Sequence, residues 1–408
     1  MLCCVSDVRR KTEDMKKIVV FGNLDLPEGS AGATRCVAFG KLAKSCGYDP
    51  IIVGVNYARK RETKGIYNGL KYELIDFDEL KFNGKDRGRR KKALKEHVLG
   101  WLYKNCTKEN TSHIILYNVK SELKWLIKYS KEEGISLIKD VVEWYDKNNF
   151  QGIAGWFNYI EDRIGLLYLN KKCENIIAIS SLFEQYYKSK KCNVIRIPTI
   201  LDVNEFHNNH CKNNDVIRIV YAGSPMKKDY IINVVKAMLI LSETDRRKIA
   251  IDFYGVTWEY FLNSGITAEQ KKNLDKFITC HGRVSLDEVK VGLSKADYTI
   301  LLRPNERYAN AGFPTKVGES MAMGIPVIAN ITSDLELYIH DNIEGIICKN
   351  ETPQSCAEAL KKATMINETK RAEMRTCARK QAEKSFYYQA YTQQFKNFLE
   401  NIDRKSVV

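Results

Sequence analysis

The alternation of short apolar runs with helical segments constrains the fold of this chain more than any other feature. The runs of the first half are Ile18–Phe21, Ile51–Val55, Ile114–Tyr117, Ser136–Asp140, Ile176–Ile179 and Val194–Ile197. A second series follows over Ile217–Ala222, Ile249–Tyr254, Phe277–His281, Tyr298–Leu302 and Val327–Ala329. Strands that alternate with helices in this way are typical of a mostly parallel sheet. We therefore predict an α/β fold.

The length of the chain indicates more than one domain. Its 408 residues exceed the usual size of a single hydrophobic core. Residues 207–216 are polar and without periodicity, which is typical of a linker between domains. We expect a flexible extension over residues 1–15, a first domain over 16–207 and a second over 208–384. A final helix, about 385–408, carries aromatic residues and is expected to pack back on the first domain.

The charge balance favours polyanions as partners. There are 65 basic and 50 acidic residues, so the formal net charge is +15. Eight basic residues and one acidic residue lie between positions 81 and 95, with Arg89, Arg90, Lys91 and Lys92 at the centre. An anionic membrane surface or a lipid diphosphate suits this cluster. A solvated helix face is at least as consistent with it, and no nucleic-acid-binding motif accompanies it.

Neither the cysteines nor the apolar segments indicate export. The twelve cysteines include no Cys-x-x-Cys pair, and no histidines cluster at the spacing of a zinc site. No stretch reaches the roughly 18–20 apolar residues of a membrane span, and the first residues lack the apolar centre of a signal peptide. We expect a cytoplasmic protein, peripheral on the inner face of the membrane if the basic cluster binds there.

Two strands run directly into glycine-bearing loops. Residues 22–33 follow the first strand and contain Gly29 and Gly32. Residues 223–229 follow the first strand of the second series and contain Gly223 and Lys228. Ligands of open α/β sheets bind at the carboxyl ends of strands, and glycine lets a ligand approach the backbone closely. We expect both loops to lie near a ligand.

The segment Phe313–Ala329 combines a loop, a short helix and a buried strand. Pro314 suits the start of a helix, and Gly324 suits the left-handed position that ends one. Lys316 falls in the first turn, where the helix dipole disfavours a cation. An anion bound at the helix start explains that placement. An ordinary αβ unit with a surface lysine explains it equally well.

Together these segments resemble the GT-B glycosyltransferases, in particular the family-4-type retaining enzymes that use sugar nucleotides. The resemblance extends from about residue 16 to the end and is strongest over residues 217–347. It implies two Rossmann-like domains that face each other across a cleft. It also implies the donor-binding positions Gly29, Gly32, Gly223, Ser224, Arg283, Thr315, Val317 and Glu319. In relatives the glutamate equivalent to Glu319 binds the ribose hydroxyls.

Two positions depart from the family pattern. The family signature has two glutamates separated by seven residues, and Ala311 occupies the first position. A subset of relatives has Pro-x-Lys before the second glutamate, which gives Lys316 a compensating anion-binding role. An arginine common after the glycine of the second loop is Ser224 here. Arg303, at the end of a strand near the same edge, is expected to replace its charge.

The resemblance implies a catalytic arrangement that uses protein cations. Breaking the bond between sugar and diphosphate builds negative charge on the leaving group, and we expect Lys228, Lys316 and Arg303 to stabilise it. No bound metal is then required, and no Asp-x-Asp motif stands out. Glu143, with Asp140, Arg163 and Asn118, is a candidate to face acceptor or sugar. The sequence is equally consistent with Asp140 as an acid at a helix start and with Glu143 as a surface glutamate.

The predicted activity is sugar transfer from a UDP- or GDP-sugar to a saccharide or lipid-linked acceptor, with retention and without a cofactor. Synthesis of a surface polysaccharide or glycolipid is the expected setting. A non-catalytic GT-B partner of an active transferase is an alternative, motivated by Ala311. A sugar-nucleotide epimerase is another. Nucleic-acid binding is a distant fourth hypothesis.

Overall fold

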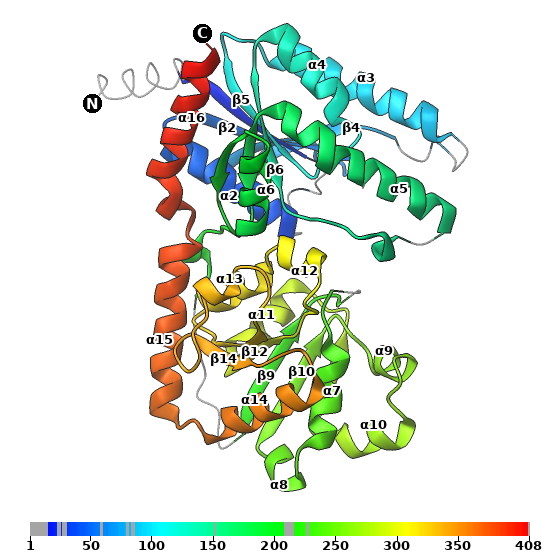
Figure 1. The fold of residues 1–408 in the computed structure, drawn as a ribbon, viewed down its shortest axis with the longest axis vertical. Helices are drawn as coiled ribbons and strands as arrows, with labels where there is room; N and C mark the ends of the chain where they lie inside the picture. The colour runs from blue at the N-terminus through cyan, green and yellow to red at the C-terminus, as the bar shows by residue number, and fades with distance from the viewer. Residues whose placement is uncertain are drawn as a thin grey trace. The chain divides into compact units, whose positions relative to one another are not determined.

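The computed structural model describes residues 15–22, 26, 31–57, 60–78, 81–82, 86–150, 152–207, 216–225 and 228–406 (Figure 1). The chain divides into two compact units. Unit 1 comprises Met1–Leu201 and Tyr388–Val408, and unit 2 comprises Asp202–Tyr387. Most of the extension expected over residues 1–15 lies outside the described residues.

Unit 1 is built on an eight-stranded sheet with the order β3-β4-β2-β1-β5-β6-β7-β8. Its strands are β1 (Lys17–Gly22), β2 (Asp49–Asn56), β3 (Lys64–Tyr67), β4 (Leu70–Asp76), β5 (Thr111–Tyr117), β6 (Ser136–Val141), β7 (Asn175–Ala178) and β8 (Asn193–Arg196). All neighbouring strands pair in parallel except β3 and β4. The antiparallel β3–β4 hairpin was not expected from the sequence.

Helices cover both faces of this sheet, so the central strands are apolar on both sides. They are α2 (Ala31–Ser45), α3 (Arg87–Asn105), α4 (Leu123–Glu133), α5 (Gly152–Ile164), α6 (Ser181–Ser189) and α16 (Thr392–Ser406). Alternate residues of β1 serve two different cores. Ile18 and Val20 pack in the core that includes α2 and α16, whereas Val19 and Phe21 pack in the core that includes α3 and α4.

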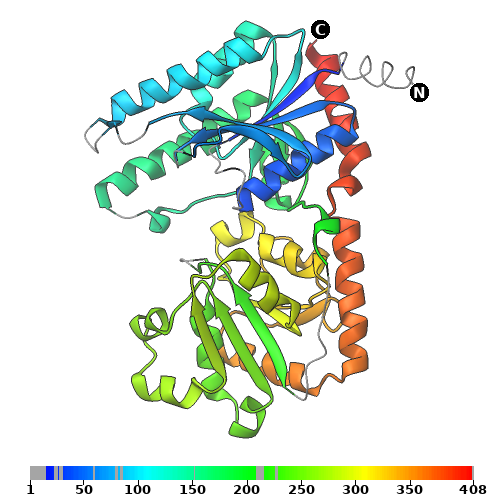
Figure 2. The same ribbon diagram turned by 180° about the vertical axis from the view of Figure 1, so that it is seen from behind.

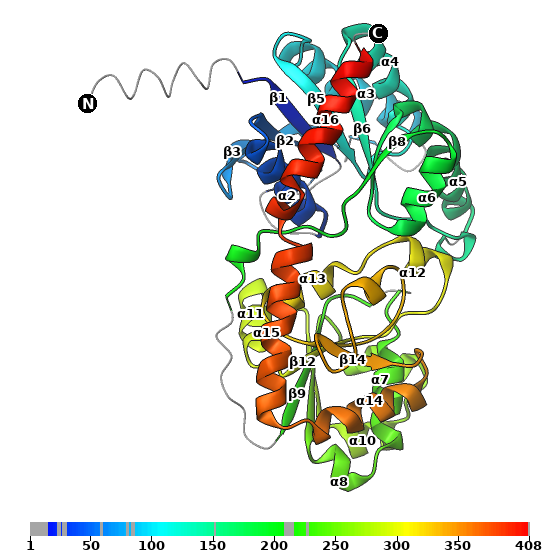
Figure 3. The same cartoon turned by 60° about the vertical axis from the view of Figure 1, so that its left-hand side comes forward.

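The last helix completes unit 1 although residues 202–387 separate it from the rest of that unit in the sequence. Its apolar face contributes Phe395, Phe398, Leu399 and Ile402 to the core of buried residues around α2. The Phe395 and Phe39 rings lie 6.4 Å apart, centroid to centroid. Figure 3 shows α16 crossing unit 1 beside α2.

Unit 2 is built on a six-stranded, fully parallel sheet with the order β11-β10-β9-β12-β13-β14. Its strands are β9 (Ile217–Ala222), β10 (Ile249–Tyr254), β11 (Ile278–Gly282), β12 (Tyr298–Leu301), β13 (Val327–Asn330) and β14 (Gly345–Cys348). The strand order runs outward from β9 in one direction and from β12 in the other. Ligands of open α/β sheets bind where the order reverses in this way.

The helices of unit 2 flank this sheet (Figure 2). They are α7 (Ile231–Ile240), α8 (Glu243–Arg246), α9 (Trp258–Asn263), α10 (Ala268–Leu274), α11 (Leu286–Ser294), α12 (Arg307–Ala311), α13 (Thr315–Ala322), α14 (Pro353–Met365) and α15 (Glu368–Ser385). A buried ion pair ties α15 to the sheet, because Arg375 Nη2 lies 2.8 Å from Asp297 Oδ1 beside β12. Both side chains are at least nine-tenths buried.

Candidate functional site

A cluster of charged side chains lies at the carboxyl ends of β9 and β12, where the strand order of unit 2 reverses. Lys316 Nζ is 2.5 Å from Asp229 Oδ2 and donates to the Tyr221 hydroxyl at 2.9 Å. The Tyr221 hydroxyl in turn donates to Asp229 Oδ2 at 2.8 Å. Arg303 Nε donates to Asp229 Oδ1 at 3.0 Å. The Asp229 carboxylate therefore holds two cations from separate elements in fixed positions.

Local structure fixes each member of this cluster. Lys316 is the second residue of α13, directly after the N-cap Pro314 and Thr315. Arg303 follows β12, and its backbone is held by Asn330, which accepts from Arg303 N at 2.8 Å and donates to Arg303 O at 2.7 Å. The predicted helix start and the left-handed Gly324 both occur, the latter with φ of 67°.

The cluster carries net positive charge, because two cations face one carboxylate. Burial alone would raise the pKa of Asp229, but Lys316 and Arg303 hold that pKa below its ordinary value. Burial also lowers the pKa of Lys316, against the opposing effect of Asp229. Desolvation thus acts on both partners of the ion pair, and the Asp229 carboxylate stays ionised at neutral pH.

Gly223, directly after β9, lets the backbone pass close to Lys316. Its φ is 133°, a conformation that other residues rarely adopt. A Cβ at this position would lie 2.7 Å from Lys316 Cε and 2.9 Å from Lys316 Nζ. A Cβ at the neighbouring Gly255 would lie 2.8 Å from the Gly223 carbonyl oxygen. Glycine at both positions therefore keeps the backbone next to the cations uncovered.

Glu319, one turn after Lys316 in α13, presents a carboxyl group to a hollow of about 410 Å³. Lys316, Thr299 and Ser320 also line this hollow, together with apolar residues of β9 and β12. Burial raises the pKa of Glu319 to about 7, although the charge of Lys316 opposes that rise. Among the described residues, none forms a hydrogen bond or an ion pair with this carboxyl group.

The other residues singled out in unit 2 differ in exposure. Ser224 and Arg283 are exposed on the loops after β9 and β11. Lys228 precedes Asp229 on the turn before α7, and Thr315 begins α13. Val317 is only 1% exposed. Its side chain belongs to the core, so only its backbone is available to a ligand.

The glycine loop of unit 1 lies mostly outside the described residues. Gly29 is among the residues that the structure does not describe. Gly32 lies in the first turn of α2, where an added Cβ would meet the Tyr117 ring at 2.7 Å. Packing against Tyr117 is therefore a sufficient reason for glycine at this position.

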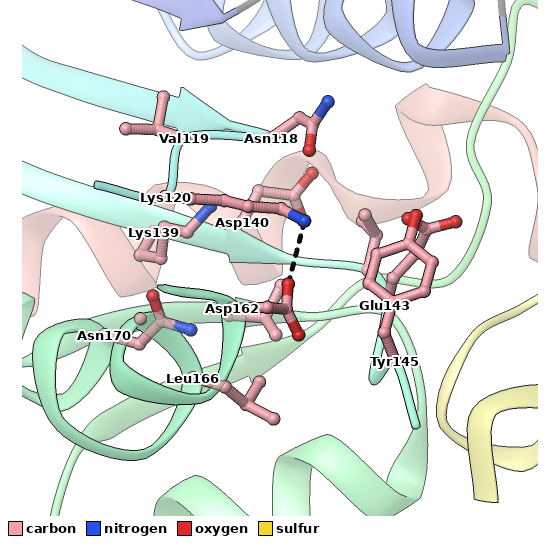
Figure 4. Close-up of a pocket in the computed structure, with 13 residues that line it drawn as sticks. Asn118, Val119, Lys120, Lys139, Asp140, Glu143, Tyr145, Asp162, Leu166 and Asn170 are labelled. Atoms are coloured by element: carbon pink, nitrogen blue, oxygen red, sulfur yellow. Dashed lines mark ion pairs between the residues drawn. The ribbon is translucent and has the colours of Figure 1, made fainter. Parts of the chain in front are cut away.

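A hollow in unit 1 collects the acidic candidates of the first half (Figure 4). Both Asp140 and Glu143 line it, and Asp140 is fully buried. Arg35 binds Asp140 through two hydrogen bonds, from Nε at 2.7 Å and from Nη2 at 2.8 Å. Asp140 therefore has a structural partner. Asn118 lines the same hollow and adopts a φ of 47°.

Sequence reasoning missed two further residues of this hollow, Lys139 and Asp162. Lys139 precedes Asp140 in β6, so the two side chains point to opposite faces of the sheet. A lysine within a short, largely buried strand was the available signal. Arg163 lies instead against Trp144, with its guanidinium carbon 5.8 Å from the ring centroid.

Neither a metal site nor a membrane-spanning helix is found among the described residues. No group of three or more His, Cys, Asp or Glu side chains in this part of the chain is arranged to hold a metal ion. Likewise, none of the helices in the described ranges combines the length and apolarity needed to cross a bilayer. Metal-independent catalysis remains a prediction.

Comparison with known proteins identifies the fold. Residues 202–381 match the family model described as glycosyl transferases group 1. No curated protein matches the chain. Sucrose-phosphate synthase from Thermosynechococcus elongatus superposes with a TM-score of 0.72 at 14% identity, covering 96% of this chain and 100% of that one.

Two further solved structures cover nearly all of the chain. HepE of Anabaena, in complex with UDP and glucose, gives a TM-score of 0.63 at 14% identity, with coverage of 95% and 100%. A glycosyltransferase from Rickettsia africae gives 0.64 at 15% identity, with coverage of 95% and 99%. These superpositions confirm the α/β, GT-B architecture expected from the sequence.

Proposed function

We propose that this chain, whose residues 202–381 match the glycosyl transferases group 1 family model, transfers a sugar from a UDP- or GDP-sugar to a saccharide or lipid-linked acceptor. Transfer with retention, in the synthesis of a surface polysaccharide or glycolipid, is the form of this activity that we favour. The observation that carries the proposal is the net positive Lys316–Asp229–Arg303 cluster beside the uncovered backbone of Gly223. HepE was solved with UDP-glucose, which supports a nucleotide-sugar donor.

In this proposal the donor spans the cluster and the carboxyl group of Glu319. The diphosphate lies against Lys316, Arg303, Lys228 and the backbone of Gly223 and Ser224. The ribose hydroxyls donate to Glu319, whose carboxyl group lacks a partner among the described residues. Thr315 and the backbone of Val317 contact the donor at the start of α13, and Arg283 lies beside the base. Gly29, which lies outside the described residues, and Gly32 remain predicted donor-binding positions.

The chemistry follows from where charge develops. As the bond between the anomeric carbon and the diphosphate breaks, negative charge grows on the leaving oxygen. Cations already fixed by Asp229 need little reorganisation to stabilise that charge. Their stabilisation increases towards the transition state, which is the condition for catalysis. Glu143 is placed by this proposal on the acceptor side, and no metal or cofactor is required.

A thermal-shift experiment tests donor binding. UDP or GDP is expected to raise the melting temperature, because a ligand that binds only the folded state stabilises it. Glu319→Ala is expected to remove most of this shift. Glu336→Ala, which changes an exposed glutamate of the same unit, is the control and is expected to keep it. A melting temperature that no common nucleotide changes would contradict the proposal.

Ala311 supports a second candidate function, a non-catalytic partner of an active transferase. This residue is fully buried at the end of α12. Because its side chain is a methyl group, the position offers no carboxylate to the donor sugar. This candidate predicts nucleotide binding without donor hydrolysis or transfer, and stable co-purification with a transferase. An epimerase would instead release an epimerised donor in the absence of acceptor, which product analysis detects.

We also propose that α3 contacts an anionic membrane face on the cytoplasmic side. Arg89 and Lys92 have side chains that are 84% and 78% exposed. Arg87 of α3 donates to Asn158 of α5 at 2.9 Å, and α5 exposes half of Trp156 and of Phe157. Cations beside exposed aromatic side chains suit the headgroup region. Arg90 and Lys91 belong to the same cluster.

Sedimentation with liposomes that contain phosphatidylserine tests the membrane contact. Reversing the charge of Arg89 and Lys92 to glutamate is expected to leave most of the protein in the supernatant. The matched control reverses Lys272 and Lys361, two exposed lysines of unit 2. Equal sedimentation of both variants and of the unchanged protein would rule out this contact.

A further inference from the structure

The hollow in unit 1 has the features of a binding site in its own right. It encloses about 430 Å³ of empty space, part of which is open to solvent. Its residues come from the ends of β5 and β6, from α5 and from the turns that follow α5. Figure 4 shows charged side chains from these elements converging on it.

Lys139 is a buried cation with few partners. Lys139 is only 5% exposed, and its ammonium group has three hydrogens to donate. Among the described residues its hydrogen bond is to Leu116 O, at 3.4 Å. Burial lowers the pKa of Lys139 to about 8, against the charge of Asp140. Donor capacity is therefore left over inside the hollow.

Asp162 has the opposite requirement. It is 7% exposed, and Oδ1 lies 2.9 Å from Lys120 Nζ. Its second oxygen, Oδ2, is buried and has no hydrogen-bond partner among the described residues. A buried polar atom without a partner destabilises the folded protein, and a ligand that supplies the partner removes that cost. Burial also raises the pKa of this carboxyl group, although Lys120 opposes the rise.

One chemical group meets both requirements at once. A hydroxyl donates one hydrogen bond and accepts others, so a hydroxyl between Lys139 and Asp162 would accept from the first and donate to the second. Glu143 and Asn118 at the same hollow repeat this mixture of acceptor and donor. The Tyr145 ring, 4.7 Å from Lys120 Nζ, adds an aromatic face.

Charge argues against an anionic ligand here. Asp140 is neutralised by Arg35. The two remaining carboxylates that line the hollow, Asp162 and Glu143, balance Lys120 and Lys139. A phosphate or carboxylate would bring a negative charge next to Asp162 Oδ2, whose lone pairs need a donor.

We propose that this hollow binds an uncharged sugar ring through its hydroxyl groups, in preference to a phosphorylated or acidic sugar. The inference rests on the proposed function and deepens it, because it assigns the acceptor end of the reaction to a neutral sugar. Lys139 and Asp162 are positioning residues for that ring. Glu143 and Lys120 complete its polar surroundings.

The experiment uses the full chain and measures saturation-transfer NMR of methyl glucoside, galactoside and mannoside. Glucose 6-phosphate and methyl glucuronide are the anionic counterparts. At least one neutral glycoside is expected to show transfer that exceeds that of both anionic sugars. Asp162→Asn and Lys139→Met are each expected to weaken this binding about tenfold or more, because each leaves a sugar hydroxyl unpaired.

The UDP-induced thermal shift serves as the readout of folding and of unit 2. Both variants are expected to keep it, which shows that they fold. Lys171→Met, an exposed lysine of unit 1, is the control and is expected to bind the glycoside normally. Absence of transfer from every neutral glycoside, equal binding by both variants, or preference for an anionic sugar would overturn the inference.

These outcomes separate the inference from the proposed function. A retained UDP shift without glycoside binding would overturn only the sugar site. Glycoside binding that depends on Lys139 and Asp162, without any nucleotide shift, would support the sugar site and contradict the donor proposal.

Discussion

At the scale of single residues, Glu319 is expected to make the proposed donor binding depend on pH. Its folded-state pKa is raised by burial to about 7, so the carboxyl group of the unliganded protein ionises as the pH rises through that value. A carboxylate accepts stronger hydrogen bonds from ribose hydroxyls than a protonated acid does. UDP-glucose affinity is therefore expected to reach a plateau above pH 7 and to fall below it, by at most about tenfold per pH unit.

Isothermal titration with UDP-glucose between pH 5.5 and 8.5 measures this dependence. UDP-glucose has no phosphate group that titrates in this range, unlike UDP. Glu319→Gln is expected to bind weakly at every pH and to lose the dependence, because glutamine does not ionise. A pH profile shared by Glu319→Gln and the unchanged protein would assign the titration to another group.

The same residue affects the stability of the unliganded protein, with the sign set by its raised pKa. Between the unfolded value, near 4.5, and about 7 the folded state binds more protons than the unfolded state. Stability from this group is therefore present at low pH and lost as the pH rises through about 7. Glu319→Gln is expected to raise the melting temperature at pH 8 and to change it little at pH 5, as measured by calorimetry.

Gly223 offers a test of the backbone that passes the cations. Gly223→Ala would place a Cβ 2.7 Å from Lys316 Cε, at a φ of 133° that alanine rarely adopts. We expect a loss of stability of about 1–3 kcal/mol and a loss of nucleotide binding, because Lys316 must move. Gly265→Ala, with a φ of 99° and no atom near the added Cβ, is the control for strain alone. It is expected to lose stability while it keeps nucleotide binding.

Residue patterns in the sequence predicted the kinds of group at this site better than their partners. An anion next to Lys316 was expected from its place in the first helical turn. In the structure, Asp229 of the same chain is one such anion, 87 positions away in sequence. A pattern within one segment carries no information on a contact between β9, α7 and α13. The same holds for the acidic pair of the first half. The sequence does not show that Asp140, and not Glu143, forms an ion pair with Arg35.

At the scale of elements, most parallel strands were predictable, whereas the β3–β4 hairpin and β14 were not. The apolar runs of the two series correspond to parallel strands, including the edge strands β8 and β11. The β3–β4 hairpin lacks such a run, and β3 is mostly exposed. Its signal is the turn Asn68-Gly69, where both residues have positive φ, 50° and 76°. Such dipeptides favour two-residue hairpins.

The last helix is expected to contribute strongly to the stability of unit 1. Phe395 is fully buried between the α2 face and the rest of α16. Phe395→Ala is expected to cost about 3–5 kcal/mol, from lost transfer energy and the cavity that remains. Gln394→Ala, an exposed neighbour on the same helix, is expected to change stability by less than about 0.5 kcal/mol. Chemical denaturation compares the two; equal midpoints would show that α16 adds little.

At the scale of the whole molecule, a nucleotide is expected to stabilise unit 2 selectively. The proposed donor groups, Gly29 and Gly32 apart, lie within Asp202–Tyr387. A ligand at 100 times its dissociation constant adds about 2.7 kcal/mol to the unit that binds it. Hydrogen exchange with and without UDP is expected to show slower exchange over residues 221–230 and 315–322. Slowing confined to unit 1 would place the nucleotide elsewhere.

The overall architecture was accessible from sequence because it depends on repeated local patterns. The residue pattern of each βα unit predicts its own strand and helix, and the polar stretch 207–216 separates the two series. The compact units divide at Leu201/Asp202 and Tyr387/Tyr388, whereas the predicted domain boundaries are 207/208 and 384/385. Three-dimensional contacts, such as the ion pair between Lys120 and Asp162, depend on packing and had no local signal.

The chain passes from unit 1 to unit 2 and then back to unit 1, which affects the order in which the ribosome completes the two units. Unit 2 has all of its residues once Tyr387 has emerged. Most of unit 1 is synthesised before unit 2. Until α16 is synthesised as well, no residues cover the apolar surface that contacts Phe395, Phe398, Leu399 and Ile402 in the folded unit. Unit 1 is therefore expected to complete its core only after unit 2 has all of its residues, and to expose this apolar surface in the interval.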